Sequence, residues 1–220
     1  MILKELRNQI IQSSRTLLAK NLISDGQGNL SAYNREKGLI AITPSAVPYQ
    51  DRELRDICVV EPDGSLVEGR WKPTSEMALH LVFYRERPDV EAVVHTHPPY
   101  TTVFGIIGSE PMPMVLNEAA MGLGGDVPVA PYGRPGTEEL AEITCQAAGG
   151  GTAAIMAHHG LVTVGGSLPQ AAISTIAAED TARAIILARS MGERVIALED
   201  SEVNVLREMF LGYRPRRSES

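Results

Sequence analysis

The sequence has 220 residues, of which 44% are hydrophobic and 21% are charged, and its formal net charge is −7. This is the composition of a globular protein that can build one sizeable core. A nucleic-acid-binding protein would carry a basic excess, and a helical membrane protein would carry a long apolar span. Neither feature is present, so we predict a cytoplasmic protein with no nucleic-acid or membrane partner. We expect one domain over residues 1–220, with about 212–220 as a flexible tail.

Apolar periodicity, capping residues and turn signals predict a series of helices and strands. In chain order we expect helix 3–21, strands 30–33, 39–43, 57–61 and 65–68, helix 74–85, strand 90–95, helices 99–107 and 137–148, strands 152–157 and 161–164, and helices 167–191 and 201–211. Thr137 and Ser167 are predicted N-caps, and Gln170 forms a capping box with Ser167. Residues 108–136 contain many Gly and Pro and are predicted to be irregular.

The order of these elements indicates an α/β fold. Short connections between strands, such as residues 34–38, are typical of hairpins and therefore favour a mostly antiparallel sheet. Helices precede and follow the strands, which favours helices on both faces of that sheet.

Two pairs of histidines indicate a metal site. His95 and His97 are two residues apart at the end of a predicted strand, so both imidazoles point to the same face. Only one of the adjacent His158 and His159 can join them, because neighbouring residues point to opposite faces. Three imidazoles with an open position form a catalytic zinc pattern, and they also suit iron, cobalt or manganese. By spacing alone, a chance pair of histidines is an equally good interpretation.

A carboxylate and a further histidine lie at the start of one predicted helix. Glu76 follows a proline turn, where a carboxylate either complements the helix dipole or acts as a general base beside a metal. His80 lies one helical turn later and is interpreted as a structural residue.

Three short loops contain glycine or hydroxyl side chains and few charges. Residues 26–29 contain two glycines, residues 43–46 contribute Thr43 and Ser45, and Thr74-Ser75 stands at a helix N-terminus. Each is an ordinary turn or cap by itself. Together they predict an anion pocket that holds phosphate with neutral donors.

The ordered set of motifs resembles the class II aldolases of the fuculose-phosphate aldolase group, in the aldolase/adducin superfamily. The matching segments are Gly28-Asn29-Leu30-Ser31, Ile42-Thr43-Pro44-Ser45, Pro73-Thr74-Ser75-Glu76, Ala92-Val93-Val94-His95-Thr96-His97, Ala130-Pro131-Tyr132 and His158-His159-Gly160-Leu161. Each segment is a weak signal, but the ordered set is specific and covers nearly the whole chain. The resemblance implies a three-layer αβα sandwich and a C4 homotetramer with sites between subunits.

The resemblance also implies a role for each matching residue. Zinc would be held by His95, His97 and His159, and Glu76 would be the catalytic acid/base. The phosphate-binding positions would be Gly28, Asn29, Ser45, Ala46, Thr74 and Ser75. Tyr213 matches a tail tyrosine that reaches a neighbouring subunit's site and protonates the aldehyde oxygen; an exposed aromatic near a chain end is the alternative.

The implied activity is that of a zinc-dependent lyase. It would reversibly cleave a ketose 1-phosphate, a small phosphorylated sugar, to dihydroxyacetone phosphate and an aldehyde through a metal-stabilised enediolate. Other members of the superfamily are 4-epimerases, dehydratases or decarboxylases, and adducin-like heads are non-catalytic modules. Epimerases typically carry Asp at the position of Glu76, and adducin-like heads lose the metal histidines, so these residues favour an aldolase.

The sequence departs from the fuculose enzymes at several positions. Gly26 stands where those enzymes usually have threonine, so one phosphate contact is lost or is supplied by Gln27. Ala46 stands where glycine is common. The apolar segment 116–125, with Met112 and Met114 just before it, is expected to reshape the aldehyde pocket. We therefore consider 5-deoxyribulose 1-phosphate and its methylthio analogue as substrates beside L-fuculose 1-phosphate.

Overall fold

The computed structural model describes residues 1–45 and 47–212. Its elements are α1 (Lys4–Ala19), β1 (Asn29–Asn34), β2 (Leu39–Ile42), η1 (Leu54–Asp56), β3 (Cys58–Val60), β4 (Leu66–Glu68), α2 (Met77–Glu86), β5 (Ala92–Thr96), α3 (Pro99–Ile107), α4 (Asn117–Leu123), β6 (Val129–Ala130), α5 (Glu138–Ala148), β7 (Ala153–Met156), β8 (Gly160–Gly165), α6 (Leu168–Ser190) and α7 (Asp200–Gly212). Ala46 and Tyr213 lie outside the described residues. Gly212, predicted to begin the tail, is the last residue of α7.

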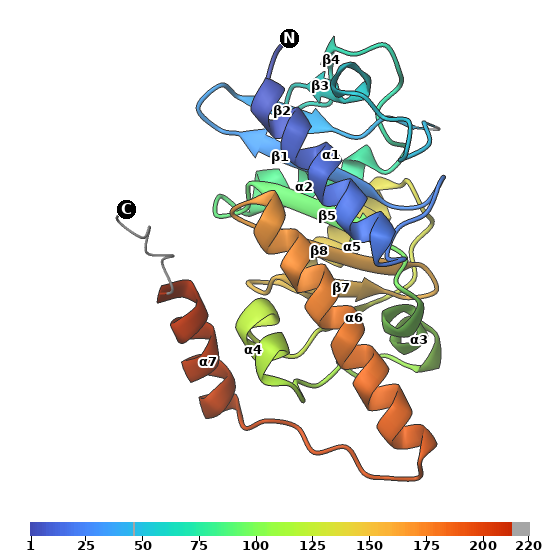
Figure 1. The fold of residues 1–220 in the computed structure, drawn as a ribbon, viewed down its shortest axis with the longest axis vertical. Helices are drawn as coiled ribbons and strands as arrows, with labels where there is room; N and C mark the ends of the chain where they lie inside the picture. Colours follow the sequence, from blue (N-terminus) through green and yellow to red (C-terminus); the bar gives the residue numbers. More distant parts are fainter. Residues whose placement is uncertain (46, 213–220) are drawn as a thin grey trace.

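The strands form one eight-stranded sheet in the order β4-β3-β2-β1-β5-β8-β7-β6 (Figure 1). Neighbouring strands are antiparallel, except that β6 runs parallel to β7. The prediction of a mostly antiparallel sheet is therefore confirmed, with the correction that the sheet is mixed. The neighbouring interior strands β5 and β8 are those that end in or begin beside the histidine motifs.

Helices cover both faces of the sheet, as predicted. In Figure 1, α1 and α6 cross the near face, while α2 and α5 lie behind the strands. Alternate residues of β5 point to opposite faces of the sheet. Val93 packs in the core between the sheet and helices α2 and α5, while Ala92 and Val94 pack in the core between the sheet and helices α1 and α6. The three-layer αβα sandwich is thus confirmed, and its strand ends carry the site residues.

The prediction that residues 108–136 are irregular is wrong at two places. This segment contains the short helix α4 and the two-residue strand β6, where only irregular structure was expected. Met112, Met114 and Leu123 are buried in a core cluster with residues of α6 and α7. Core packing therefore accounts for their apolar character, and the expected effect of this segment on an aldehyde pocket stays a prediction.

Side-chain N-caps are present at α5 and α6, the two helices for which the sequence predicted them. Thr137 accepts a hydrogen bond from Leu140 N, and Ser167 accepts one from Gln170 N. The capping box is only half formed, because Gln170 Oε1 accepts from Gly166 N, one residue before the N-cap.

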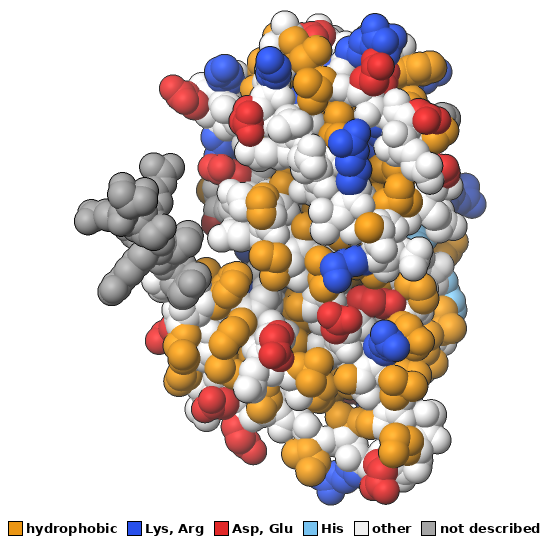
Figure 2. Space-filling view, viewed as in Figure 1, with side chains coloured by type: hydrophobic (Ala, Val, Ile, Leu, Met, Phe, Trp, Pro, Cys, Tyr) orange, Lys and Arg blue, Asp and Glu red, His pale blue; other side chains and the backbone are white. Residues whose placement is uncertain are grey.

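The surface in Figure 2 shows acidic and basic side chains interspersed over the face that α1 and α6 present. Large apolar side chains are exposed toward the C-terminal end of α6 and beyond it, where Met191 and Ile196 are 77% and 82% exposed. Among the described residues, no helix combines the length and apolarity that a membrane span requires.

Candidate active site

The pairing of β5 with β8 brings the two histidine motifs together. Thr96, the last residue of β5, lies opposite Leu161 of β8, so His97 and His159 flank the same end of this strand pair. Gly160 lets the strands approach closely, because a Cβ at this position would collide with the backbone carbonyl of Thr96. The glycine beside His159 is therefore what permits this close approach of β5 and β8.

Four potential metal ligands converge at this strand end and form a cluster, the metal group. One ligand atom from each of Glu76, His95, His97 and His159 lies within 4.8 Å of all the others. His95 Nε2 is 3.0 Å from both His97 Nε2 and Glu76 Oε2, and His159 Nε2 is 3.2 Å from Glu76 Oε1. These separations are close to those between ligand atoms of one tetrahedral ion.

The hydrogen bonding of the histidines fits a metal ion. His95 Nδ1 must donate its hydrogen to Leu161 O, because a carbonyl only accepts, which leaves Nε2 as the nitrogen that can bind a metal ion. Nε2 faces a carboxylate oxygen and another imidazole nitrogen. Burial, with the neighbouring His95 and His159, lowers the pKa of His97 to about 3, which keeps this imidazole neutral. Three imidazole nitrogens and a carboxylate that converge in this way could hold one shared divalent ion.

The contacts of Glu76 distinguish its two interpretations, which are complementing the helix dipole and acting as a base beside a metal. Glu76 is the N-cap residue of α2, but its side chain does not bond to the helix backbone. It accepts a hydrogen bond from Asn29 Nδ2 at 2.9 Å and lies against His95 and His159. Burial alone would raise the pKa of Glu76, but His159, His95 and Asn29 outweigh it and hold this pKa far below its usual range. The carboxylate therefore serves the site and not the helix.

A chain of buried hydrogen bonds fixes Asn29. Because the amide nitrogen of Asn29 donates to Glu76, its Oδ1 accepts from His80 Nε2 at 2.5 Å. His80 Nδ1 then accepts from the Ser31 hydroxyl, which in turn accepts from Tyr84 Oη at 2.6 Å. Burial lowers the pKa of His80 to about 3, so the neutral imidazole can both donate and accept. The structural interpretation of His80 is thus sharpened: it orients the amide that holds Glu76.

The adjacent histidines point in different directions. His158 has a φ of 57°, its backbone N–H donates to Gly105 O, and its ring lies 6.2 Å from the ring of Tyr132. The ring of His159 lies 4.8 Å from that of His95. The geometry therefore brings His159, and not His158, to the metal group.

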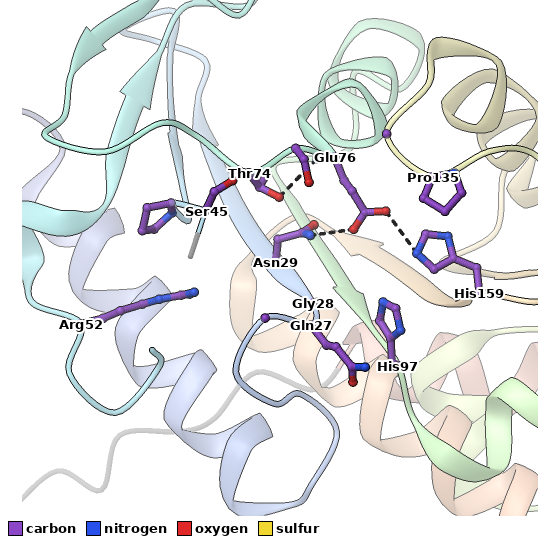
Figure 3. A pocket seen from close by; sticks show the side chains of 14 residues that line it. Gln27, Gly28, Asn29, Ser45, Arg52, Thr74, Glu76, His97, Pro135 and His159 are labelled. Carbon is purple, nitrogen blue, oxygen red and sulfur yellow. Dashed lines mark hydrogen bonds and ion pairs between the residues drawn. The ribbon is translucent and has the colours of Figure 1, made fainter. Parts of the chain in front are cut away.

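The loops predicted to bind phosphate meet in one cavity of about 540 Å³ (Figure 3). Backbone bonds from Ser45 N to Lys72 O and from Thr74 N to Thr43 O join two of these loops into a short ladder. The predicted residues that line the cavity are Gly28, Asn29, Ser45, Thr74, Ser75, Glu76, His97 and His159. In Figure 3, Ser45 and Thr74 lie on one side of the cavity, and His97 and His159 lie on the other.

The backbone of residues 26–29, the glycine loop, restricts which side chains can occur there. Gly28 has a φ of 81°, and a Cβ there would lie 2.8 Å from Ile23 Cγ2 and 2.9 Å from His95 O. Gly26 has the same φ but open space around it. A threonine at position 26 would therefore strain this loop, and Gln27 lines the cavity beside it.

Sequence reasoning missed several residues of the cavity. Pro135 and Gly136 contribute from the segment before α5, and Arg52, a residue that is 6% exposed, contributes its guanidinium. Arg52 belongs to no recognisable motif, and only the chain path after Ser45 carries it to the cavity. The predicted pocket of neutral donors therefore also contains a cation.

Comparisons with known proteins agree with this geometry. The model of the Class II Aldolase and Adducin N-terminal domain family matches residues 8–186. A 5-deoxy-D-ribulose 1-phosphate aldolase of Bacillus thuringiensis serovar kurstaki is 34% identical over 97% of this chain and 99% of its own. A 5-methylthioribulose-1-phosphate/5-deoxyribulose-1-phosphate aldolase of Rhodospirillum rubrum is 34% identical over 94% and 92% of the two chains.

Similarity to epimerases covers a smaller part of the chain. An L-ribulose-5-phosphate 4-epimerase of Salmonella paratyphi B is 38% identical, but over only 48% of this chain and 46% of its own. Among solved structures, an L-fuculose 1-phosphate aldolase superposes with a TM-score of 0.89 at 34% identity, covering 94% of this chain and 96% of that one. The chain belongs to the class II aldolase and adducin N-terminal domain family.

Proposed function

We propose that this chain is a metal-dependent aldolase that reversibly cleaves a 5-deoxy or 5-methylthio ketose 1-phosphate to dihydroxyacetone phosphate and an aldehyde. The observation that carries the proposal is the convergence of three imidazoles and Glu76 on one side of a cavity whose other side presents hydroxyl groups. One side suits negative charge that develops during carbon–carbon cleavage, and the other suits a phosphate.

The proposed metal is zinc, held by His95, His97 and His159, with Glu76 beside it. When bound, a divalent ion supplies Lewis-acid stabilisation of the negative charge that develops as the carbon–carbon bond breaks. Manganese, cobalt or iron are alternatives, because all accept imidazole ligands.

Glu76 is the proposed acid/base. In the cleavage direction, the hydroxyl of the carbon that becomes the aldehyde gives its proton to the group that protonates the aldehyde oxygen in the reverse reaction, predicted to be Tyr213. The bonding electron pair stays on the dihydroxyacetone phosphate fragment, the aldehyde leaves, and a proton from the Glu76 carboxyl neutralises the resulting carbanionic carbon. In the condensation direction, the Glu76 carboxylate removes that proton. The hydrogen bond from Asn29 supports this role, because it holds the carboxylate at the histidines while leaving Oε1 without a hydrogen bond.

The proposed phosphate site combines Ser45, Thr74 and Ser75 with the loop of Gly28 and Asn29. It is supported by the ladder that joins two of the loops and by the N-terminus of α2 next to Thr74. The role of Ala46 stays a prediction. The role of Tyr213 and the cytoplasmic location also stay predictions.

We also propose a homotetramer. Ile106 and Ile107, at the end of α3, are 56% and 61% exposed, and the preceding Gly105 bonds to the backbone of His158. Tyr132, 62% exposed, lies beside the same histidine. An apolar surface next to the metal group suits a subunit contact that completes the site. Light scattering coupled to gel filtration tests the proposal, and a monomer would contradict it.

The sugar is proposed from two relatives that are each 34% identical over nearly the whole chain, whose names specify 5-deoxyribulose and 5-methylthioribulose 1-phosphates. The decisive experiment offers the zinc-loaded enzyme these two substrates and L-fuculose 1-phosphate, with coupled detection of dihydroxyacetone phosphate. We expect the highest kcat/KM for a 5-deoxy or methylthio sugar. Absence of dihydroxyacetone phosphate from every substrate would overturn the proposed function.

A further inference from the structure

The cavity wall away from the histidines contains the guanidinium of Arg52, which forms no ion pair within the described residues. Arg52 is the only Lys or Arg among the residues that line the cavity in the described part of the chain. In Figure 3 its side chain extends toward the space between Ser45 and the Gly28 loop. We propose that Arg52 binds the substrate's phosphate directly and so determines the preference of this cavity for a dianionic substrate. This inference rests on the proposed function.

The side chain of Arg52 is held rigidly. Its guanidinium stacks on the ring of Tyr49 at 3.6 Å, and its Nε donates to Val47 O at 2.9 Å. Tyr49 in turn donates its hydroxyl hydrogen to Gly28 O at 2.6 Å, and Asp25 accepts from Tyr49 N. Arg52 and the glycine loop are therefore fixed relative to each other through one aromatic residue, which limits the conformational entropy lost when an anion binds.

The remaining hydrogens of the guanidinium are not all used. Arg52 Nη1 is buried and has no hydrogen-bond partner among the described residues. Residues 1–45 and 47–212 also provide no carboxylate that forms an ion pair with Arg52, in contrast to Arg7 and Arg70, which both pair with acidic side chains. A buried charge without a partner is unfavourable, so a bound anion would supply the ion pair and the hydrogen bond that Arg52 lacks.

Phosphate is the anion that suits this position. A guanidinium presents parallel N–H groups that match two oxygens of a phosphate, and hydroxyl donors stand on the same side of the cavity at Ser45 and Thr74. The other half of the proposed substrate, a deoxy or methylthio aldehyde, has no negative charge for Arg52 to bind. The position of Arg52 therefore orients the substrate with its phosphate beside Arg52, Ser45 and Thr74 and with its reacting carbons beside the histidines.

Titration calorimetry of the zinc-loaded protein with inorganic phosphate tests the inference without requiring turnover. Arg52→Gln should weaken phosphate binding about 10- to 100-fold, as expected for a lost charge-assisted contact, while Arg52→Lys should lose less because it keeps the charge. Arg55→Gln is the matched control, since Arg55 is exposed and pairs with Glu53. Equal affinity of Arg52→Gln and wild type, or equal losses in the Gln and Lys variants, would overturn the proposal.

Kinetics separate binding from positioning. Arg52→Gln should raise the KM for the ketose 1-phosphate about 10-fold or more and change kcat less, because the phosphate stays bound throughout the reaction. A lower kcat at unchanged KM would overturn the assignment. If the wild type binds phosphate through Arg52 but cleaves no ketose 1-phosphate, the proposed function fails and the anion site stands.

Crystals of wild-type protein soaked in inorganic phosphate keep the test independent of folding of the variants. An anion within hydrogen-bonding distance of the Arg52 guanidinium supports the inference. An anion bound only to the loops of Ser45 and Thr74, away from Arg52, would overturn it.

Discussion

The two sides of the cavity are built in different ways. The metal side consists of side chains that a strand pair and a helix N-cap hold in contact, with His95 fully buried and Asn29 5% exposed. The anion side consists of loops, in which Ser45 is half-buried and Ser75 is exposed. The metal side therefore depends on few side chains that each matter greatly, whereas the anion side distributes binding over several donors.

This difference follows from the chemistry that each side is proposed to perform. Ligands of one ion and a proton donor must be held within a fraction of an ångström, which buried hydrogen-bond networks achieve. A phosphate is large, has several acceptor oxygens and tolerates partial sets of donors. Substitutions should therefore have larger effects on the metal side than on the anion side.

The largest effect is expected at the adjacent histidines. His159→Ala should reduce bound zinc from about one ion per chain toward none, and abolish cleavage, because an open three-histidine site loses a ligand. His158→Asn is the control, since asparagine tolerates the φ of 57° at that position. Elemental analysis after gel filtration measures both. Full zinc content in His159→Ala, or loss in His158→Asn, would reverse the assignment of the ligand.

Glu76→Gln should retain zinc but lower kcat about 10²- to 10⁴-fold, because glutamine keeps the shape and the contact with Asn29 but cannot transfer a proton. Steady-state kinetics measure the loss, and metal analysis of the same preparation shows that the ligands persist. Turnover within a few-fold of wild type would remove Glu76 from proton transfer.

The glycine loop allows backbone strain to be separated from steric collision. Gly26→Ala should destabilise by about 1–2 kcal/mol, the cost of a left-handed backbone. Gly28→Ala carries the same φ and in addition collides with Ile23 and His95 O, so it should cost about 1–3 kcal/mol more. Chemical denaturation of both variants measures the difference. Equal stability would mean that the loop moves freely relative to β5.

The smallest effect is expected at the far end of the hydrogen-bond chain. Tyr84→Phe removes the donor to Ser31 and should cost about 1 kcal/mol of stability and a few-fold in kcat. Tyr33→Phe is the control, because Tyr33 packs on Tyr84 with ring centroids 5.2 Å apart and its hydroxyl makes no hydrogen bond among the described residues. If both variants behave alike, the chain to Asn29 does not orient Glu76.

Much of the fold could be predicted because its signals are local. Caps such as Thr137, alternating apolar residues in the strands and short hairpins follow from interactions within a few residues of chain. α4 and β6 could not be predicted, since two residues of strand or seven of helix form only when the surrounding core stabilises them. The burial of Met112 and Met114 could not be predicted for the same reason: composition does not distinguish a core from an apolar pocket.

The sequence by itself determined the type of site. Two-residue spacing places His95 and His97 on one face, and the ordered motifs name Glu76, His159 and the phosphate loops. The tertiary structure agrees with the motifs that His159 faces the metal group while His158 turns away, and it alone decided that His80 acts through Asn29 and that Arg52 reaches the cavity. Spacing fixes neighbours along one element, but contacts between residues about 50 positions apart, such as Asn29 and His80, depend on how strands and helices pack.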